Sequence, residues 1–222
     1  MSISTNIQSI RTHIPAHVRL VCVSKFNPNE SIEEAYASGE RIFGESKVQE
    51  LCSKYETLPK DIFWHFIGHL QSNKIKFIVP FVSLIHGVDS YRLLTEINKQ
   101  AEKQGKTIDC LLQVHIAKEE TKFGFSPDEL LETLASGEWK MLKNVHICGL
   151  MGMATFTDNR DQIRSEFKTL KTIFNKVKDE FFSSTNSFIE LSMGMSDDYQ
   201  IAIEEGSTLV RVGSSIFGNR NY

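Results

Sequence analysis

Short runs of β-branched and apolar residues alternate with helical patterns along the whole sequence, and this alternation constrains the fold more than any other feature. The strand-like runs are short and bounded by turn residues, whereas the helical patterns repeat apolar residues every three or four positions. We predict eight strands, at residues 19–25, 41–44, 62–68, 83–88, 109–116, 146–153, 187–192 and 208–213. Strands that alternate with helices favour a parallel sheet joined by crossover helices.

The helical patterns between these strands have recognisable ends. The longest follows Asp158 and repeats apolar residues at spacings of four and three: Ile163, Phe167, Leu170, Phe174, Val177 and Phe181. Such a stripe indicates a helix face packed on the core. Further helices are predicted at residues 30–38, from Ser90 to near Gly105, after Ser126-Pro127, and from Ser196-Asp197-Asp198 to Gly206. An isoleucine pattern at positions 3, 7, 10 and 14 predicts an extra helix before the first strand.

Eight strand–helix units predict an α/β fold, namely a single-domain (β/α)8 TIM barrel that spans residues 1–222. The fold typically has about 250 residues, so this barrel would be compact. An open doubly wound sheet is the alternative. That fold usually has a glycine-rich first turn, but the first predicted strand here runs into Ser24-Lys25-Phe26-Asn27-Pro28. We expect the extra N-terminal helix to cover the floor of the barrel.

The charge balance argues against nucleic acid or a membrane surface as a partner. The 222 residues include 25 basic and 28 acidic ones, for a net charge of −3, and 41% are hydrophobic. This composition supports one large core but gives no net field to hold a phosphate backbone. No apolar stretch approaches about 18 residues. The four cysteines, Cys22, Cys52, Cys110 and Cys148, form no C-x-x-C pair. We therefore expect a cytoplasmic protein in a reducing compartment.

Lys25 stands at the exit of the first predicted strand, after the apolar residues 20–23. The working face of a TIM barrel is formed by the carboxyl ends of its strands. Partial desolvation there would lower the pKa of the lysine and favour the free amine, which forms a Schiff base with a carbonyl. The alternative interpretation is a lysine that extends its ammonium into water.

The exits of the seventh and eighth predicted strands have the composition of phosphate-binding loops. They read Ser192-Met193-Gly194-Met195-Ser196 and Arg211-Val212-Gly213-Ser214-Ser215. Glycines let the backbone approach phosphate oxygens, hydroxyls and amides donate to them, and Ser196 would begin the next helix. Asp197 and Asp198 oppose this hypothesis unless they point outward, because they repel a dianion. Two ordinary turns remain the alternative.

Three other patterns do not support a site. Residues 39–46 have the glycine spacing of a Walker A loop, but Glu45 stands where the lysine must be. His65 and His69 lie four residues apart in a predicted strand, a spacing that forms no compact zinc site. The pairs Glu119-Glu120 and Glu204-Glu205 are typical of solvated surfaces.

Taken together, seven groups of residues resemble the YggS/PROSC family of pyridoxal-phosphate homeostasis proteins. They are Val23-Ser24-Lys25; Phe43-Gly44-Glu45; the block from His65 to Lys74 (HFIGHLQSNK); Lys122-Phe123-Gly124; Gly149-Leu150-Met151; the block from Leu191 to Asp198 (LSMGMSDD); and residues 210–213 with 216–218 (VRVG and IFG). They occur in the family's order along nearly the whole chain. The HFIG and SMGMS blocks are the most specific of them.

The resemblance implies a barrel similar to the N-terminal domain of alanine racemase, with Lys25 holding pyridoxal 5′-phosphate (PLP) as a Schiff base. It also implies that Ser192 and Ser196, with Gly213 and Ser214, hold the phosphate, that Met195 belongs to the same cofactor-binding set, and that Arg211 faces the pyridine nitrogen. One position departs from the family, which usually has asparagine after F-G-E where this chain has Ser46. The hydrogen bond normally made there is therefore in question.

The resemblance favours a carrier that binds and protects PLP and delivers it to PLP-dependent apoenzymes, without turnover of its own. An arginine at the pyridine nitrogen leaves that nitrogen unprotonated and the ring a poor electron sink. Racemases built on this barrel add a second domain, for which we expect no room before Tyr222. A small amino-acid racemase or lyase and a Schiff-base aldolase without a cofactor are the alternatives. We expect a monomer.

Overall fold

The strands close into a barrel in a computed structural model that describes residues 2–119 and 123–218. Each strand pairs in parallel with its neighbours in chain order, and β8 pairs with β1. The strands are β1 (Arg19–Val23), β2 (Ile42–Glu45), β3 (Phe63–Phe66), β4 (Leu84–Val88), β5 (Ile108–Gln113), β6 (Val145–Met151), β7 (Glu190–Ser192) and β8 (Leu209–Val212). The predicted TIM barrel is confirmed, and the open sheet is excluded.

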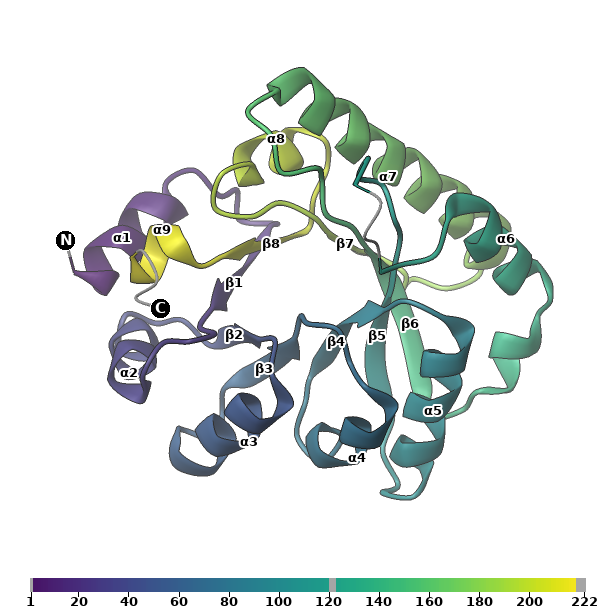
Figure 1. Cartoon of the computed structure of the whole chain (residues 1–222), viewed down its shortest axis with the longest axis horizontal. Coiled ribbons are helices and arrows are strands. Elements are labelled where there is room, and N and C mark those ends of the chain that lie inside the picture. The colour runs from purple at the N-terminus through teal and green to yellow at the C-terminus, as the bar shows by residue number, and fades with distance from the viewer. Residues whose placement is uncertain (1, 120–122, 219–222) are drawn as a thin grey trace.

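Helices surround the barrel on its outside (Figure 1). They are α1 (Ile3–Arg11), α2 (Asn29–Ala37), α3 (Val48–Thr57), α4 (Ile75–Ile78), α5 (Tyr91–Glu102), α6 (Pro127–Ala135), α7 (Arg160–Phe181), α8 (Tyr199–Glu204) and α9 (Ser214–Phe217), with 3-10 turns at Ser72–Lys74 and Glu138–Met141. Ser90 caps α5, and Ser126 forms a capping box with Glu129 at the start of α6. None of the helices in the described ranges combines the length and apolar character of a membrane span.

Apolar residues form two layers, one between the strands and the helices and one inside the barrel. The predicted stripe on α7 belongs to the outer layer, because all its members from Ile163 to Val177 are buried and Phe181 packs against them. The inner layer is smaller and consists of Val21, Leu84, Leu111, Cys148, Met151 and Leu209. Because side chains alternate along a strand, the next inward position after Leu209 is Arg211, and the next after Leu84 is His86. Polar side chains therefore share the barrel interior.

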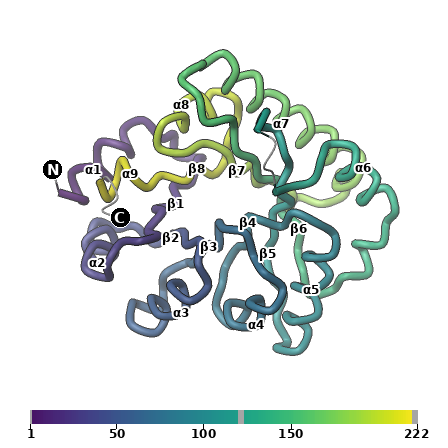
Figure 2. The backbone as a smooth tube through the Cα atoms, in the orientation of Figure 1, coloured from purple at the N-terminus to yellow at the C-terminus, as the bar shows by residue number. Residues whose placement is uncertain are grey.

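The N-terminal helix does not cover the floor of the barrel, so that expectation was wrong. The α1 helix packs against α9 and α2 in the outer ring (Figure 2). Its Asn6 amide donates to the Ile216 carbonyl (2.9 Å). A physical reason is that α9 has only four residues, so α1 completes the outer ring beside it with its buried Ile7 and Ile10. At the amino ends of the strands, a cavity of about 450 Å³ stays open, lined by Arg19, Phe63, His65, Asp109 and His146 among others.

Candidate functional site

Lys25 lies in a tight turn directly after β1, at the carboxyl end of the barrel. The Ser24 N–H donates to the Gly44 carbonyl (3.0 Å), and the Asn27 N–H donates back to the Ser24 carbonyl (3.0 Å). Phe26 takes a φ of 66°, which is unusual for a residue with a side chain. Lys25 itself is half-buried. The structure therefore ends β1 two residues earlier than predicted and places the lysine at the rim of the barrel.

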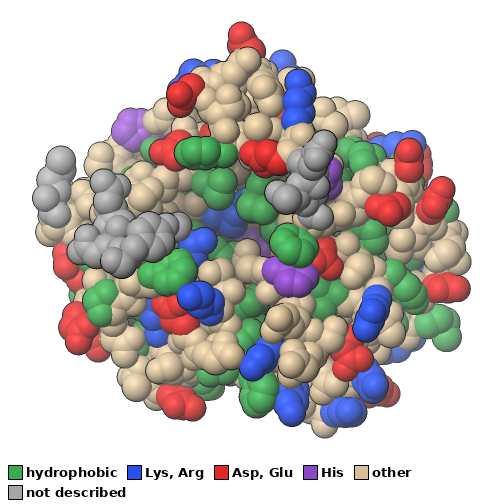
Figure 3. Space-filling model, viewed as in Figure 1, with side chains coloured by type: hydrophobic (Ala, Val, Ile, Leu, Met, Phe, Trp, Pro, Cys, Tyr) green, Lys and Arg blue, Asp and Glu red, His purple; other side chains and the backbone are tan. Residues whose placement is uncertain are grey.

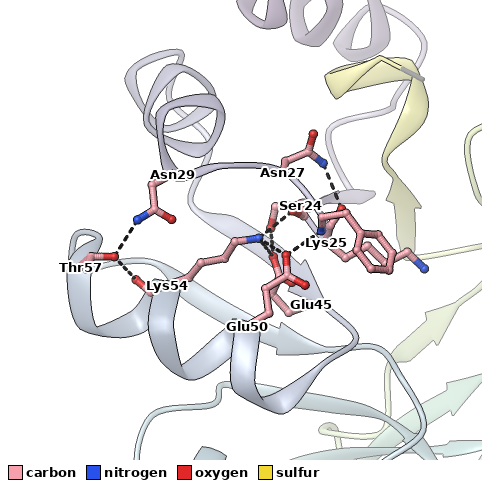
Figure 4. A network of polar contacts seen from close by, with 9 residues as sticks. Ser24, Lys25, Asn27, Asn29, Glu45, Glu50, Lys54 and Thr57 are labelled. Carbon is pink, nitrogen blue, oxygen red and sulfur yellow. Dashed lines mark hydrogen bonds and ion pairs between the residues drawn. The ribbon is translucent and has the colours of Figure 1, made fainter. Parts of the chain in front are cut away.

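Three charged side chains hold this turn from below, and we call Glu45, Glu50 and Lys54 the turn clamp (Figure 4). The Lys54 ammonium donates to the Ser24 carbonyl (2.9 Å), to Glu45 Oε1 (2.8 Å) and to Glu50 Oε1 (2.6 Å). The Ser24 hydroxyl donates to Glu45 Oε1 (2.6 Å), and the Phe26 N–H donates to Glu50 Oε1 (2.6 Å). The clamp thus binds the peptide groups on both sides of the lysine, whose side chain is directed away from the clamp.

The loops after β7 and β8 meet each other and approach β1. The Gly213 N–H donates to the Ser196 hydroxyl (3.2 Å), which joins the two loops. A Cβ atom on Gly213 would lie 3.2 Å from both the Cβ and the carbonyl oxygen of Val23, so the chain directly after β8 packs closely against the end of β1. Val23 is two residues from Lys25. The structure therefore brings Lys25, Ser196 and Gly213 to one edge of the barrel.

The short helix α9 begins at this edge, directly after Gly213. Ser214 and Ser215 form its first turn and are exposed, and the structure records no acceptor for their N–H groups among the described residues. Two unpaired N–H groups and two hydroxyls suit an anion. The helix predicted to begin at Ser196 starts later than expected: α8 begins at Tyr199, because the Asp198 carboxylate accepts the Met195 N–H (2.5 Å) and holds residues 195–198 in a turn.

The two aspartates of this loop behave differently from each other. Asp197 is exposed, whereas Asp198 is buried, and burial raises the pKa of its carboxyl group. Because Asp198 is bound to the Met195 N–H, its carboxylate is turned into the loop. The Met195 side chain is 37% exposed. Repulsion of a dianion by Asp198 is therefore reduced but not removed.

Arg211 lies inside the barrel below these loops, and its hydrogen-bond partners among the described residues are all neutral. Its Nη1 donates to the Ser192 carbonyl (3.0 Å) and the Ser192 hydroxyl (2.5 Å), and its Nη2 donates to the Gly152 carbonyl (3.1 Å). Burial lowers the pKa of Arg211 to about 10, so the guanidinium remains a cation near pH 7. Viewed from this end, the molecule is hollowed at its centre, with basic and histidine side chains at the bottom (Figure 3).

Ser192 and two histidines continue the polar interior beneath Arg211. His86 Nδ1 lies 3.0 Å from the Ser192 hydroxyl, and His86 Nε2 lies 3.0 Å from His65 Nδ1. Ser192 and His86 are fully buried and His65 is 3% exposed. Burial lowers the pKa of His65 to about 3 and that of His86 well below its usual value, so both imidazoles are neutral. The Ser192 hydroxyl is therefore directed to Arg211 and His86.

Sequence reasoning missed His86 and Lys54 as parts of the site. A signal for His86 was present, because it stands two positions after Leu84 in a predicted strand and so shares its inward face. Lys54 gave no comparable signal, since its burial depends on where α3 lies over the β1 turn. His65 was considered only as a zinc ligand. No group of three or more potential metal ligands occurs within the described parts of the chain.

Two other residues singled out in the sequence, His69 and Ser46, lie near the same edge of the barrel. His69 follows β3, where its Nδ1 lies 3.1 Å from the Asp89 carboxylate and its ring stacks on Phe123 at 4.2 Å. Ser46 lies against β3, and a Cβ atom on Gly68 would be 2.4 Å from the Ser46 carbonyl oxygen. The motif residue Lys122, the acidic residue Glu120 and Tyr222 lie outside the described residues.

The sequence matches the family model described as alanine racemase, N-terminal domain, over residues 1–221. A pyridoxal phosphate homeostasis protein of Aquifex aeolicus is 40% identical over 206 residues, which cover 92% of this chain and 88% of the relative. The protein of the same name from Mus musculus is 37% identical over 92% of this chain and 77% of its own length. This chain belongs to the pyridoxal phosphate homeostasis protein family. The resemblance found in its motifs is thereby confirmed.

Solved structures of family members have the same architecture. PipY from Synechococcus elongatus without PLP superposes with a TM-score of 0.92 at 35% identity, covering 98% of this chain and 100% of PipY. The structure of PipY with PLP bound gives a TM-score of 0.88 over the same shares of both chains. Alanine racemase from Clostridium difficile, at 13% identity and a TM-score of 0.75, shares the fold, and this chain covers 56% of it.

The donor set at this edge of the barrel suits a phosphorylated aldehyde with a basic ring nitrogen. Ser214 and Ser215 leave N–H groups without recorded acceptors among the described residues, and Lys25 supplies a primary amine at the same edge, two residues after the Val23 that Gly213 approaches. Arg211 lies below as a cation whose bonds use only part of its donors. The phosphate, the aldehyde and the ring nitrogen of such a ligand would thus each have a complementary group in the protein.

Proposed function

We propose that the protein binds PLP and acts in its homeostasis, holding the cofactor through a Schiff base to Lys25. The observation that carries this proposal is the meeting of the Lys25 turn with the Ser196 and Gly213 loops above Arg211. It is supported by curated relatives named pyridoxal phosphate homeostasis proteins and by the structure of PipY with PLP bound. PLP supplies an aldehyde that condenses with a primary amine and releases water.

In this proposal, each group of the site has a separate task. Ser196, Gly213 and Ser214 hold the phosphate with hydroxyl and amide donors, and the exposed Met195 side chain flanks the cofactor. Arg211 donates to the pyridine nitrogen, and the turn clamp fixes the backbone from which Lys25 extends. The Ser192 hydroxyl is already bound to Arg211 and His86, so we assign it to orienting Arg211 and not to the phosphate.

We also propose that the protein is a carrier without turnover, which hands PLP to PLP-dependent apoenzymes. A guanidinium keeps its proton even where burial lowers its pKa to about 10, so it donates to the ring nitrogen and leaves that nitrogen unprotonated. The four cysteines are free thiols in the structure, which supports the reducing setting of the cytoplasm.

Replacing Lys25 tests the covalent assignment. The Lys25→Ala variant should stay folded by circular dichroism and lose the visible absorbance that PLP gains on forming the Schiff base. Lys74→Ala is the matched control, because it removes another lysine at the same end of the barrel and should keep the colour. Borohydride reduction and peptide mapping should place the label on Lys25. A full label on another lysine, with colour retained in Lys25→Ala, would overturn the assignment.

The phosphate assignment has its own test. Charge-assisted hydrogen bonds contribute roughly 1.5–3 kcal/mol each, so pyridoxal without phosphate should bind far more weakly than PLP. Ser196→Ala should narrow the difference in affinity between PLP and pyridoxal. The control Ser53→Ala, which replaces an exposed serine of α3, should leave this difference unchanged. Equal affinities of the wild type for both ligands would remove the case for these loops.

An amino-acid racemase is the second candidate function, and the pair of His69 and Asp89 favours it. A carboxylate 3.1 Å from an imidazole orients a general acid or base at this end of the barrel. The deciding measurement is solvent-deuterium incorporation at Cα of L- and D-amino acids. Exchange at enzymatic rates of about 1–10³ per second, lost in both Lys25→Ala and His69→Gln, would replace the carrier proposal. Exchange no faster than in Lys25→Ala supports the carrier.

A further inference from the structure

Four buried side chains form a hydrogen-bonded row across the inside of the barrel, from the proposed cofactor end toward the floor. The row runs from Arg211 on β8 through Ser192 on β7 and His86 on β4 to His65 on β3. Its three contacts are 2.5 Å, 3.0 Å and 3.0 Å long. All four residues are at most 4% exposed, and His65 also lines the floor cavity. We call these residues the interior row.

The chemistry of the groups gives the interior row one direction. An arginine donates only, so the Ser192 hydroxyl accepts from Arg211 and has its own proton left to donate. The available acceptor is His86 Nδ1, and His86 therefore carries its proton on Nε2. That proton is donated to His65 Nδ1, which leaves the His65 proton on Nε2 beside the floor cavity. Each hydrogen bond of the row is then satisfied.

Charge keeps this arrangement fixed over the physiological pH range. Both imidazoles are buried, and the charged groups that shift their pKa values, Arg19 and Arg211, are cations. Arg19 forms an ion pair with Glu190 (2.5 Å), and Glu190, Asp109 and His146 line the same floor cavity as His65. Burial and these cations both disfavour a proton on either ring. The nearest acidic influence on Arg211 is Asp198, whose carboxylate is held by the Met195 N–H. The row therefore has no protonation change that would reverse its direction near neutral pH.

We propose that His65 and His86 are positioning residues for Arg211. By accepting the Ser192 proton, His86 turns the oxygen lone pairs of that hydroxyl toward the guanidinium. The two Nη1 donors are then used by Ser192, and one Nη2 donor is used by Gly152. Within the described ranges, this leaves the Nε–H and the second Nη2–H without a recorded acceptor and open to a ligand. The inference rests on the proposed function, in which that ligand is the pyridine nitrogen of PLP.

A consequence is selectivity for a ring nitrogen that accepts a hydrogen bond. A correctly oriented N–H donor favours a neutral pyridine, whereas a nitrogen that carries a methyl group or a proton leaves the buried cation facing a cation. If Arg211 is free to turn, this discrimination should weaken, although the phosphate and Lys25 still bind the ligand. The interior row is thus expected to affect ligand discrimination more than the fold.

The tautomers can be measured without any ligand by ¹⁵N NMR of the imidazole rings. We expect His65 and His86 to carry their protons on Nε2 and to show no titration between about pH 5.5 and 8.5. Free imidazole added to the same sample, whose protonation changes in this range, serves as the control. A proton on His86 Nδ1, or titration of either buried ring in this range, would overturn the proposed direction.

Ligand discrimination tests the positioning role itself. The probes are pyridoxine 5′-phosphate, which lacks the aldehyde, and its N1-methylated analogue, so that Schiff-base chemistry does not enter. The wild type should bind the first at least roughly tenfold more tightly, the scale of one charge-assisted hydrogen bond. His86→Leu should lose most of this ratio. His86→Asn should restore it, because its carbonyl oxygen accepts the Ser192 proton where Nδ1 did.

Two controls separate positioning from general damage. Leu84→Val alters the same inward face of β4 outside the row and should keep the ratio of affinities. Ser192→Ala removes the acceptor directly and should reproduce the loss seen in His86→Leu, which keeps the test decisive if His86→Leu does not fold. An unchanged ratio in Ser192→Ala, or an equal loss in Leu84→Val, would overturn the positioning role. A wild type that binds neither probe nor PLP would instead refute the proposed function.

Discussion

Within the turn clamp, Glu45 is the residue whose charge depends most on its surroundings. It is fully buried between β2 and α3, and burial raises the pKa of its carboxyl group to about 7 despite the nearby Lys54 ammonium. Its Oε1 accepts bonds from Ser24 and Lys54, while its buried Oε2 has no partner among the described residues. An ionised Glu45 therefore costs folding free energy that its two bonds only partly offset.

The stability of the protein should fall as Glu45 ionises. Between pH 4.5, the ordinary pKa, and about 7, the folded state holds a proton that the unfolded chain has released. The free energy of unfolding contributed by this group is therefore largest below pH 4.5 and decreases as the pH rises, by on the order of 3 kcal/mol in total. Urea unfolding at a series of pH values should show the wild type losing stability relative to Glu45→Gln.

The matched control for this prediction is Glu56→Gln, an exposed carboxylate on the neighbouring helix α3. Its stability should follow the wild type at every pH. A wild type that gains stability over Glu45→Gln between pH 5 and 7 would contradict the raised pKa, because it would place the folded-state value below the ordinary one.

For single residues, sequence reasoning located those at the strand exits. It missed the residues that lie beneath them, under the β1 turn or inside the barrel. Lys25, Ser196 and Gly213 meet as predicted, because parallel strands all end at one face of the barrel. Lys54 was not foreseen, since pairing it with Glu45 requires knowing how α3 lies over the β1 turn. The Ser192 hydroxyl was assigned to the phosphate because its strand position does not reveal that His86 faces it.

Among the connecting elements, the turn between β7 and α8 is the one most dependent on a single glycine. Gly194 has a φ of 96°, and a Cβ atom there would lie 2.6 Å from the Ala202 Cβ and 2.9 Å from the Tyr199 Cα. Gly194→Ala should therefore destabilise the protein by about 2–4 kcal/mol, through backbone strain and a clash with α8. The free energy of unfolding measures this loss.

Gly39→Ala separates the two causes, because Gly39 has a φ of 101° but nothing within 4 Å of the added atom. This control should lose only the strain, about 1–2 kcal/mol. Equal losses in both variants would mean that the contact with α8 contributes nothing.

The start of α6 is held by a reciprocal pair of hydrogen bonds. The Ser126 hydroxyl accepts the Glu129 N–H (3.2 Å), and the Glu129 carboxylate accepts the Ser126 N–H (2.8 Å). Ser126→Ala should cost about 1 kcal/mol of unfolding free energy. Combined with Glu129→Ala, the loss should differ from the sum of the single losses, because the two bonds form one unit. Strict additivity in this double-mutant cycle would contradict the capping box.

The elements themselves were predicted well, apart from their ends and three helices, α3, α4 and α9, of which α9 has only four residues. All eight strands formed, although several predicted runs extended one to three residues into the adjoining loops, where apolar residues continue beyond the paired part of the strand. The α3 helix was overlooked even though Val48, Leu51, Cys52 and Tyr55 follow helical spacing. The α4 helix has four residues, too few to give a periodic signal. Where α1 packs was beyond sequence reasoning, because it depends on α9 being short.

For the molecule as a whole, binding of PLP should raise the free energy of unfolding and the Tm. A ligand that binds only the folded state stabilises it by about 2.7 kcal/mol at a concentration of 100 times its dissociation constant. For a chain of this size, that corresponds to a rise in Tm of roughly 5–10 °C. Calorimetric scans with PLP should show this rise for the wild type and a smaller one for Lys25→Ala. Inorganic phosphate at equal concentration is the control, and no PLP-dependent shift in the wild type would contradict binding.

The barrel closes by pairing its first strand, β1, with its last, β8. This order bears on when PLP can bind during biosynthesis. Lys25 emerges from the ribosome early, whereas Ser196, Gly213 and Ser214 are added 171 to 189 residues later. In the proposed site, a nascent chain would expose the Lys25 amine without the groups proposed to hold the phosphate, and the barrel itself stays open until β8 arrives. The proposed site therefore predicts that PLP binds after translation, to a finished pocket and not to a growing chain.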